Sequence, residues 1–388
     1  MGLTGDEAMA YAAKQSNVDV VAAYPITPQT IIVEAFSEYV HNGEVKAEFV
    51  CVESEHSAMS ACIGSSLTGA RVFTATSSQG LALMHEMLYI ASGLRCPIVM
   101  AVANRALSAP INIHGDHSDM MGSRDSGWIQ IYAENAQEAY DWNLQAFKIA
   151  EDPKVLLPVS VNIDGFIITH AMERVEVLED GKVAKYLATR KPTITVDPDK
   201  PITVGALCFT DYYYEIKRQQ VEALKEAPKV IATVTKEYEA LTGRHYSSID
   251  TYGMEDAEAA ILCLGSTAGT AKAVAKSLRS KGIKVGVIKP WVYRPFPTEE
   301  TVKALGNAKA LAVLDKACSF GAPYNALCND IVSALYQNGK SLKIFNCVYG
   351  IGGRDMTPTD LEAVFKEALE VAKTGTVKEP VKFIGVRE

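Results

Sequence analysis

The chain has 388 residues, of which 48% are hydrophobic and 22% charged, a composition typical of a globular protein. Its length predicts two or three domains, because a single core stops growing at about 250–300 residues. The formal net charge of −8, without a run of lysines or arginines, argues against a nucleic-acid-binding surface. The N-terminal segment lacks the features of a signal peptide, and no uncharged apolar stretch approaches the ~18 residues of a membrane span. We therefore expect a cytoplasmic protein.

The first part of the chain, up to about residue 170, alternates strand-like and helix-like segments. The expected strands are 19–23, 47–52, 71–76, 97–103 and 156–162. The expected helices are 29–41, 55–68, 80–94 and 136–150. This alternation predicts right-handed βαβ units and a mostly parallel sheet that is covered by helices on both faces.

The middle of the chain, at about 171–248, is less regular and is expected to connect two α/β domains. Within it, 173–207 has the pattern of extended structure with turns, and 212–243 that of one or two amphipathic helices. A second alternation follows, with strands expected at 259–266, 284–293, 310–317 and 342–350. We therefore place the first domain with its connecting segment at 1–248, and a smaller α/β domain at 249–388.

Polar residues gather where the strands of the first domain are expected to end. These ends carry, in chain order, Tyr24-Pro25-Ile26-Thr27-Pro28, Glu53-Ser54-Glu55-His56, Ser77-Ser78-Gln79-Gly80 and Asn104-Arg105. A long loop at 106–121 follows the last of them. In an open parallel sheet, ligands bind at the carboxyl ends of the strands. Four consecutive polar loops exceed what packing requires, so this edge is expected to hold the functional site.

The first strand end places Thr27 between two prolines, Pro25 and Pro28. Each proline fixes its own φ and keeps the preceding residue out of helical space. The pattern therefore predicts a rigid turn that holds the Thr27 hydroxyl at a set position, as catalysis by positioning requires.

Taken singly, these features also have simpler explanations. Glu53 and Glu55 fit solvated acids at a helix N-terminus, which the helix dipole favours, and Arg105 fits an ion pair with an acid. The loop contains two histidines and two aspartates that suggest a metal site, namely His114, Asp116, His117 and Asp119. We assign no metal, because no supporting ligand cluster occurs elsewhere and a loop that faces a substrate explains these residues better.

The sequence gives little support to other kinds of site. Its eight cysteines include no pair at C-x-x-C spacing, whereas zinc and iron–sulfur sites favour close pairs, so no cluster is expected on this chain. The glycine-rich segments 264–270 and 349–355 lack the full nucleotide-binding spacing and are interpreted as tight turns. No nucleophile-elbow serine is found.

Three segments of the first domain carry a resemblance to a known family: AAYPITPQT, VESEHSAMSACIGSSLTGARVFTATSSQGLALMHEML and ANRALSAPINIHGDHSDMMGSRDSGWIQ. Together they resemble the alpha subunit of pyruvate:ferredoxin oxidoreductase, in the 2-oxoacid:ferredoxin oxidoreductase family. VIKPWVYRPFP, VLDKACSFG and YGIGGRD extend the resemblance over nearly the whole chain. The resemblance implies a thiamine-diphosphate pyrimidine-binding domain and a smaller α/β domain of the transketolase C-terminal type.

The resemblance also implies that two chains share the thiamine diphosphate. The alpha chain is expected to hold the aminopyrimidine, and a beta chain the diphosphate and its Mg²⁺. The diphosphate-binding Gly-Asp-Gly signature of the family is missing here, with Gly115-Asp116-His117 as the nearest approach. Four-iron four-sulfur clusters are expected on gamma and delta-type or ferredoxin-like partner subunits, and ferredoxin is expected to accept the electrons. No nucleic acid or membrane partner is expected.

Site roles follow from the same resemblance. The family needs one carboxylate on the pyrimidine ring for acid–base catalysis, and ESEHSAMSA places it on Glu55, with Glu53 less favoured. Arg105 is expected to hold the substrate carboxylate in its guanidinium fork, and Thr27 to meet the substrate or the cofactor. The other expected residues are those of the cofactor pocket, Pro25, Ser78 and Gln79, and those of the substrate loop, His114, Asp116, His117 and Asp119.

The implied reaction removes carbon dioxide from a 2-oxoacid, passes electrons to the clusters and transfers the acyl group to coenzyme A. In the related oxalate oxidoreductase an arginine replaces the threonine of this motif, so Thr27 favours a substrate with one carboxylate. Pyruvate is therefore the leading substrate, while 2-oxobutyrate or a branched 2-oxoacid fits the same argument. The rival hypotheses are a beta-type component of a thiamine-dependent 2-oxoacid dehydrogenase, a transketolase and a non-catalytic scaffolding subunit.

Overall fold

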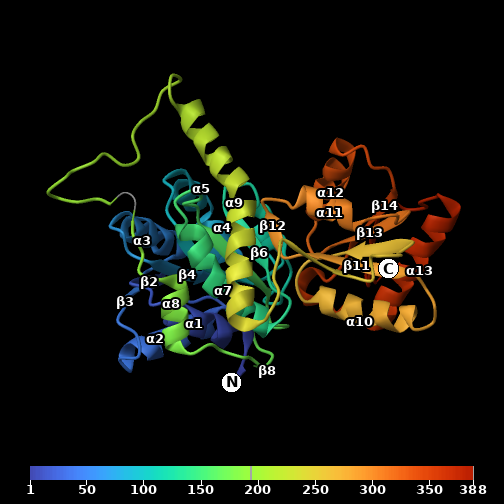
Figure 1. The fold of residues 1–388 in the computed structure, drawn as a ribbon, viewed down its shortest axis with the longest axis horizontal. Coiled ribbons are helices and arrows are strands. Elements are labelled where there is room, and N and C mark those ends of the chain that lie inside the picture. The colour runs from blue at the N-terminus through green and yellow to red at the C-terminus, as the bar shows by residue number, and fades with distance from the viewer. Residues whose placement is uncertain (193–194, 388) are drawn as a thin grey trace.

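The computed structural model describes residues 1–192 and 195–387 and contains two large sheets, each with helices on both faces (Figure 1). The first sheet consists of β2 (Val20–Ala23), β3 (Glu48–Cys51), β4 (Val72–Thr76), β5 (Ile98–Asn104), β6 (Ile129–Tyr132), β7 (Val159–Asp164) and β12 (Val292–Arg294). Its order is β12-β6-β7-β5-β4-β2-β3, and all neighbours are parallel except β12, which is antiparallel to β6. The predicted parallel α/β sheet is confirmed.

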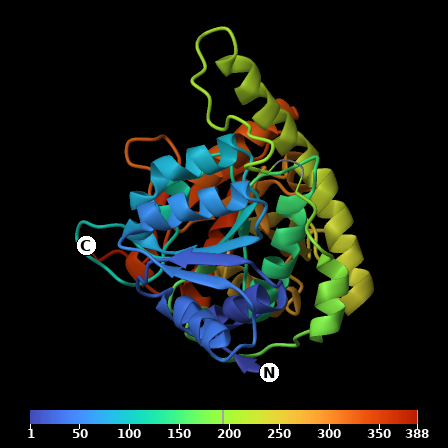
Figure 2. The ribbon, with the colours of Figure 1, turned by 90° about the vertical axis from the view of Figure 1, so that its left-hand side faces the viewer.

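Two layers of helices bury this sheet. One layer contains α1 (Gly5–Gln15), α2 (Thr30–His41) and α7 (Ala136–Glu151), and the other contains α3 (Glu55–Leu67), α4 (Ser78–Leu83) and α5 (His85–Gly93). Figure 2 shows the strands between the layers. Strands β4 and β5 are buried along their whole length, as expected for parallel strands covered on both faces. A short helix, α6 (Ser118–Gly122), follows in the loop after β5.

The second sheet has the order β15-β14-β13-β10-β11-β9, in which only β9 runs antiparallel to its neighbour. Its strands are β9 (Ile249–Tyr252), β10 (Ala259–Leu262), β11 (Val285–Pro290), β13 (Ala310–Asp315), β14 (Lys343–Val348) and β15 (Val381–Phe383). Its helices are α10 (Thr267–Arg279), α11 (Thr298–Ala304), α12 (Ala326–Gln337) and α13 (Pro358–Thr374), with a 3₁₀ turn η1 (Ile351–Gly353) after β14. This is the expected second α/β unit.

The segment expected as one strand at 284–293 is instead two strands that belong to different sheets. The chain leaves the second sheet after β11, turns at Trp291 and pairs in β12 with β6, a strand that the sequence pattern did not reveal. Trp291 is buried here, and its indole N–H donates to Glu138 Oε2 at 2.8 Å. This crossing joins the two units, so the division at residue 248 stays a prediction.

The connecting segment also differs from its prediction. The stretch 173–207, of which residues 193–194 lie outside the described part, was expected to be extended but includes the helix α8 (Asp180–Leu187). Burial of Val183, Tyr186 and Leu187 outweighs the weak local helix signal. At its start, β8 (Glu173–Arg174) pairs with β1 (Gly2–Leu3). The helix expected at 80–94 is interrupted at Met84, between α4 and α5.

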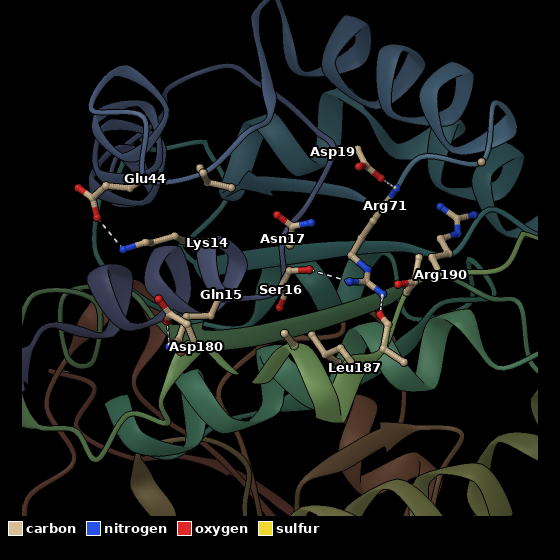
Figure 3. A pocket seen from close by; sticks show the side chains of 15 residues that line it. Lys14, Gln15, Ser16, Asn17, Asp19, Glu44, Arg71, Asp180, Leu187 and Arg190 are labelled. Carbon is tan, nitrogen blue, oxygen red and sulfur yellow. Dashed lines mark hydrogen bonds and ion pairs between the residues drawn. The ribbon is translucent and has the colours of Figure 1, made fainter. Parts of the chain in front are cut away.

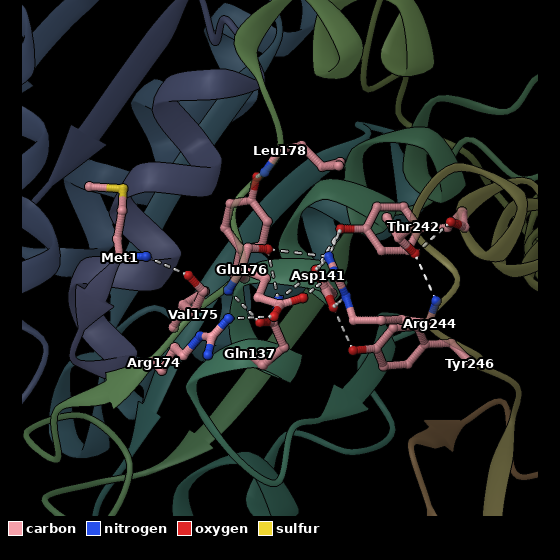
Figure 4. Close-up of polar contacts among 12 residues, drawn as sticks. Met1, Gln137, Asp141, Arg174, Val175, Glu176, Leu178, Thr242, Arg244 and Tyr246 are labelled. Carbon is pink, nitrogen blue, oxygen red and sulfur yellow. Dashed lines mark hydrogen bonds and ion pairs between the residues drawn. The ribbon is translucent and has the colours of Figure 1, made fainter.

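One long helix, α9 (Tyr213–Thr242), replaces the one or two helices expected at 212–243. Its C-terminal end is held to α7 by the buried carboxylate of Asp141, which accepts hydrogen bonds from Tyr238 (2.5 Å), Tyr246 (2.6 Å) and Arg244 Nε (2.7 Å; Figure 4). The N-terminal end of α9 projects beyond the body of the protein (Figure 1).

No helix in the described part of the chain is both long and apolar enough to cross a membrane.

Candidate active site

The four polar strand ends lie side by side, because β3, β2, β4 and β5 are consecutive neighbours in the first sheet. The expected edge of the sheet therefore brings together residues that are far apart in the sequence. Arg105 reaches the Thr27 turn, and Glu55 reaches Gly80 after β4.

The turn that carries Thr27 is anchored by Gln29, a residue that the sequence analysis did not single out. The Gln29 side chain is fully buried, and its Nε2 donates to the carbonyl oxygens of Ala75 (2.7 Å) and Tyr24 (3.2 Å). Thr27 itself is exposed, and its peptide bond to Pro28 is cis. Gln29 thus ties the turn to the end of β4, while Thr27 stays at the surface.

Glu55 and Glu53 have different environments, although they are two residues apart. Glu55 begins α3 and is only 6% exposed, with its side chain against Gly80, where an added Cβ would lie 2.5 Å from Glu55 Oε1. Glu53 is exposed, and a hydrogen bond from Ser57 lowers its pKa. The Glu55 carboxylate accepts no hydrogen bond from the described residues, so it is the buried acid that can receive a ligand's N–H.

Arg105 is a buried cation that is held by main-chain oxygens. It is 6% exposed, and its Nε and Nη1 donate to the carbonyl oxygens of Asn112 (2.8 Å) and Thr27 (3.0 Å). Burial lowers the pKa of this guanidinium, and the charge of Asp119 opposes that effect. Within the described residues no carboxylate lies at ion-pair distance from it, and an arginine has five N–H donors. The guanidinium therefore keeps donors for an anionic ligand.

Asp119 connects the ends of β4 and β5. Its Oδ2 accepts the backbone N–H groups of Ser78 (3.0 Å) and Arg105 (2.9 Å), and its Oδ1 accepts Asn104 Nδ2 (2.8 Å). Burial raises the pKa of Asp119 to about 6. Ser78 has a φ of +49°, a backbone conformation that residues other than glycine rarely adopt. Its Oγ donates a hydrogen bond to Ala106 O at 2.5 Å. Asp119 therefore holds the backbone after β4 and the backbone after β5 in a fixed relative position.

Two other residues of the expected substrate loop contact the second unit. Asp116 Oδ2 accepts the N–H of Gly352 at 2.9 Å. The His117 backbone N–H donates to the carbonyl oxygen of Lys316 at 2.7 Å, and His117 Nε2 lies 2.7 Å from Asp164 Oδ1, which also accepts Lys316 Nζ at 3.0 Å. Although burial favours the neutral acid, Lys316 and His117 hold the pKa of Asp164 well below its usual range. Asp116 and His117 thus join the two units at the rim of the site.

His114 is the one exposed member of that group, with its ring centroid 5.1 Å from that of Phe166. Gln79, beside the buried Ser78, is partly exposed, and Pro25 is exposed on the Thr27 turn. No group of three or more histidine, cysteine, aspartate or glutamate side chains in the described ranges is arranged to hold a metal ion.

The site is an open edge of the first sheet. A cavity of about 420 Å³ lies instead before the amino ends of β2 and β4 (Figure 3). Two of the three cations that line that cavity are paired, Lys14 with Glu44 at 2.6 Å and Arg71 with Glu151 at 2.7 Å, whereas Arg190 forms no ion pair with the described residues. Neither Thr27, Glu55 nor Arg105 lines it.

Residues 11–236 match a family described as pyruvate flavodoxin/ferredoxin oxidoreductase, thiamine diphosphate-binding, and residues 257–361 match pyruvate:ferredoxin oxidoreductase core domain II. The pyruvate synthase subunit PorA of Thermotoga maritima is 49% identical over 100% of this chain and 98% of its own length. The chain belongs to this family of pyruvate:ferredoxin oxidoreductase alpha subunits. As a PorA-type chain it carries a thiamine-diphosphate-binding domain and is one subunit of a multi-subunit enzyme.

Other similarities of this PorA-type chain bear on substrate and fold. A ketoisovalerate oxidoreductase subunit VorA of Pyrococcus horikoshii is 44% identical over 98% of this chain and 96% of its own length. A solved 2-oxoglutarate:ferredoxin oxidoreductase of Magnetococcus marinus has a TM-score of 0.73 at 19% identity, covering 95% of this chain and 65% of that one. A split-gene transketolase chain has a TM-score of 0.55 at 14% identity, covering 96% of this chain and 100% of that one. The two structures show the fold alone, and the expected transketolase-like architecture is confirmed.

Proposed function

We propose that this alpha subunit oxidatively decarboxylates pyruvate with coenzyme A to acetyl-CoA and carbon dioxide and passes the electrons to ferredoxin. One observation carries the choice of site: a buried guanidinium, Arg105, and a buried carboxylate, Glu55, lie at the same edge of the sheet without being paired to each other. The carboxylate of a 2-oxoacid can bind to the Arg105 guanidinium. The ring nitrogen of an aminopyrimidine can share a hydrogen bond with the Glu55 carboxyl group. The alternative substrates are 2-oxobutyrate and a branched 2-oxoacid.

The residues around Glu55 fit the aminopyrimidine half of thiamine diphosphate. When bound, the cofactor supplies the carbanion that attacks the keto carbon. Glu55 holds a proton between its carboxylate and the pyrimidine ring nitrogen, which is acid–base work for one positioned carboxyl group. Gly80 leaves the Glu55 side chain the space that a Cβ would fill. Ser78 and Gln79 directly precede Gly80, and we assign them to the same cofactor pocket.

Arg105 binds and orients the substrate carboxylate. Its two bonds to main-chain carbonyls fix the guanidinium plane and leave N–H groups that match a carboxylate in a fork. Its burial strengthens the attraction, because the local dielectric is lower than that of water. The Thr27 carbonyl accepts a hydrogen bond from Arg105, which places Thr27 beside the same substrate. Because position 27 carries no second cation, the site favours a substrate with one carboxylate.

We further propose that a beta chain completes the site with the diphosphate and Mg²⁺, and that gamma and delta-type or ferredoxin-like chains hold the four-iron four-sulfur clusters. The open edge of the site and the missing Gly-Asp-Gly signature support the first proposal. The scattered cysteines, five of which are buried in the described structure, support the second.

The function is tested on the complex purified without oxygen, by viologen reduction with and without coenzyme A. Pyruvate, 2-oxobutyrate, 2-oxoisovalerate, 2-oxoglutarate and oxalate serve as substrates. We expect coenzyme A-dependent reduction that is fastest with pyruvate. A faster reaction with 2-oxoisovalerate would keep the mechanism and overturn the substrate, and no reduction by an intact complex would overturn the function.

The role of Arg105 is tested by Arg105→Ala, for which we expect a loss of about 100-fold in kcat/KM for pyruvate, the usual scale for a positioned catalytic group. Arg218→Ala is the matched control, since Arg218 is an exposed residue of α9 that pairs with Glu222. Full activity of Arg105→Ala would contradict the assignment and favour a scaffolding subunit.

A further inference from the structure

Arg105 is held in place partly through Asn112, a residue that contacts a glycine turn near the C-terminal end of the chain. The carbonyl that receives Arg105 Nε belongs to Asn112, in the loop after β5. The Asn112 side chain makes two hydrogen bonds: its Oδ1 accepts the N–H of His114 at 2.6 Å, and its Nδ2 donates to the carbonyl of Gly352 at 3.0 Å. Gly352 lies in η1, beyond the last long strand of the second sheet and 240 residues from Asn112.

The glycine turn at 350–353 is shaped to receive this loop. Gly352 has a φ of +62°, and a Cβ on it would lie 2.6 Å from Asn112 Nδ2. A Cβ on Gly353, which has a φ of +79°, would overlap His114. The N–H of Gly352 donates to Asp116 Oδ2 at 2.9 Å, while its carbonyl accepts Asn112. Only glycine combines this backbone conformation with so close an approach.

The part of the loop next to Asn112 has few other restraints. Ile111 is 79% exposed, and Ile113 is exposed as well. Further along the loop, the bond from the Ala106 N–H to the His114 carbonyl, at 3.1 Å, closes its base. The Asn112–Gly352 bond therefore carries much of the task of placing the carbonyl that holds Arg105.

We propose that Asn112 is a positioning residue for the substrate carboxylate, and that the glycine turn 350–353 sets the place of Arg105 through it. The inference rests on the proposed function, since it takes Arg105 as the group that binds the 2-oxoacid. It gives the second unit a part in substrate binding. A displacement of about 1 Å at a binding group is enough to cost up to 100-fold in rate.

The test uses the intact complex with two single variants, Asn112→Ala and Gly352→Ala, and their combination. Gly339→Ala is the matched control, because Gly339 has a φ of +61° in the same unit and has no atom within 4 Å of an added Cβ. The KM for pyruvate, the KM for coenzyme A and the thiamine diphosphate affinity are measured for each. The last is read by direct titration, independently of turnover.

We expect both single variants to raise the KM for pyruvate about tenfold, which is about 1.4 kcal/mol of binding. The KM for coenzyme A and the cofactor affinity stay within twofold. The double variant is no worse than the poorer single variant, because both remove one contact. Gly339→Ala leaves the KM for pyruvate unchanged.

Two results would overturn the inference. One is an unchanged KM for pyruvate in Asn112→Ala. The other is an equal loss in pyruvate, coenzyme A and cofactor binding, which indicates a purely structural role. In both cases the wild-type complex still oxidises pyruvate, so the proposed function stands. Failure of the proposed function is recognised separately, as a wild-type complex that does not oxidise pyruvate.

Discussion

The carboxylate of Asp119 accepts the backbone N–H of Arg105 at 2.9 Å, and the same oxygen accepts the backbone N–H of Ser78 at 3.0 Å. One buried acid thus fixes the residue that follows β5 relative to the segment that follows β4. In the proposed reaction Arg105 binds the substrate, and the segment that contains Ser78 lies beside the cofactor. Their relative position is therefore set by the polypeptide before either ligand arrives.

The buried state of Asp119 predicts a pH dependence of stability. Burial raises its pKa from 3.8 to about 6. Between these values the folded chain binds more protons than the unfolded chain, so this group's contribution to the free energy of unfolding falls as the pH rises. The shift corresponds to about 3 kcal/mol. Urea denaturation should show that the stability of wild type relative to Asp119→Asn falls by about that amount from pH 4 to pH 7.

Asp211→Asn is the control for that experiment, because Asp211 is exposed just before α9. Its stability difference from wild type should stay flat over the same pH range. A wild-type advantage over Asp119→Asn that grows toward pH 7 would mean that the carboxylate is stabilised by its four hydrogen-bond donors more than it is destabilised by burial.

Glu55→Gln and Glu53→Gln separate the two acids of the ESEH motif. We expect Glu55→Gln to lower turnover by about 100-fold or more, since the amide cannot share the proton of the pyrimidine ring as a carboxylate does. Glu53→Gln should stay within about twofold, because Glu53 is exposed. Viologen reduction with saturating pyruvate measures both, and a comparable loss in the two variants would contradict the assignment.

Gly80→Ala tests the space beside Glu55. A Cβ at this position would lie 2.5 Å from Glu55 Oε1, so the carboxylate must move. We expect the affinity for thiamine diphosphate to fall at least tenfold, measured by titration of the cofactor-free complex. Gly64→Ala, in α3 with no atom within 4 Å of the added Cβ, should keep the affinity and stabilise the helix by about 1 kcal/mol. Unaltered binding by Gly80→Ala would place the pyrimidine elsewhere.

Thr27→Arg tests the argument on substrate charge. A second guanidinium beside Arg105 favours a dianion, so we expect the kcat/KM for pyruvate to fall more than tenfold and oxalate to inhibit more strongly than in wild type. Thr27→Val, which removes the hydroxyl at nearly constant size, should not change inhibition by oxalate. If oxalate inhibited the two variants equally, position 27 would not contact the substrate carboxylate.

The meeting of the polar segments that form the candidate site was predictable from the sequence, because it depends on a local rule. Parallel strands end at one edge, so the polar segments after β2, β3, β4 and β5 had to meet once the strands were recognised. The difference between Glu55 and Glu53 was less accessible. It depends on which carboxylate faces Gly80, a contact between the starts of two different helices.

What the sequence could not reveal are contacts that no local pattern encodes. His117, Asp116 and Asp119 are near neighbours in one polar motif, yet the first pairs with Asp164, the second with Gly352 and the third with the backbone of Ser78 and Arg105. The passage of the chain from β11 to β12 depends in the same way on burial of Trp291 against α7. Each of these contacts joins segments that are separated in the sequence, within the first unit or between the two units.

Both oxygens that hold the Arg105 guanidinium belong to the main chain, at Thr27 and Asn112. At Thr27 the turn that carries this carbonyl is anchored by Gln29, so a substitution there replaces the side chain but leaves the carbonyl in place. The side chain at position 27 is thus free to change without withdrawing the oxygen that grips the arginine. If Arg105 binds the substrate as proposed, substrate preference can therefore diverge at position 27 among related enzymes, by natural drift or by design, while the arginine that binds the carboxylate keeps its support.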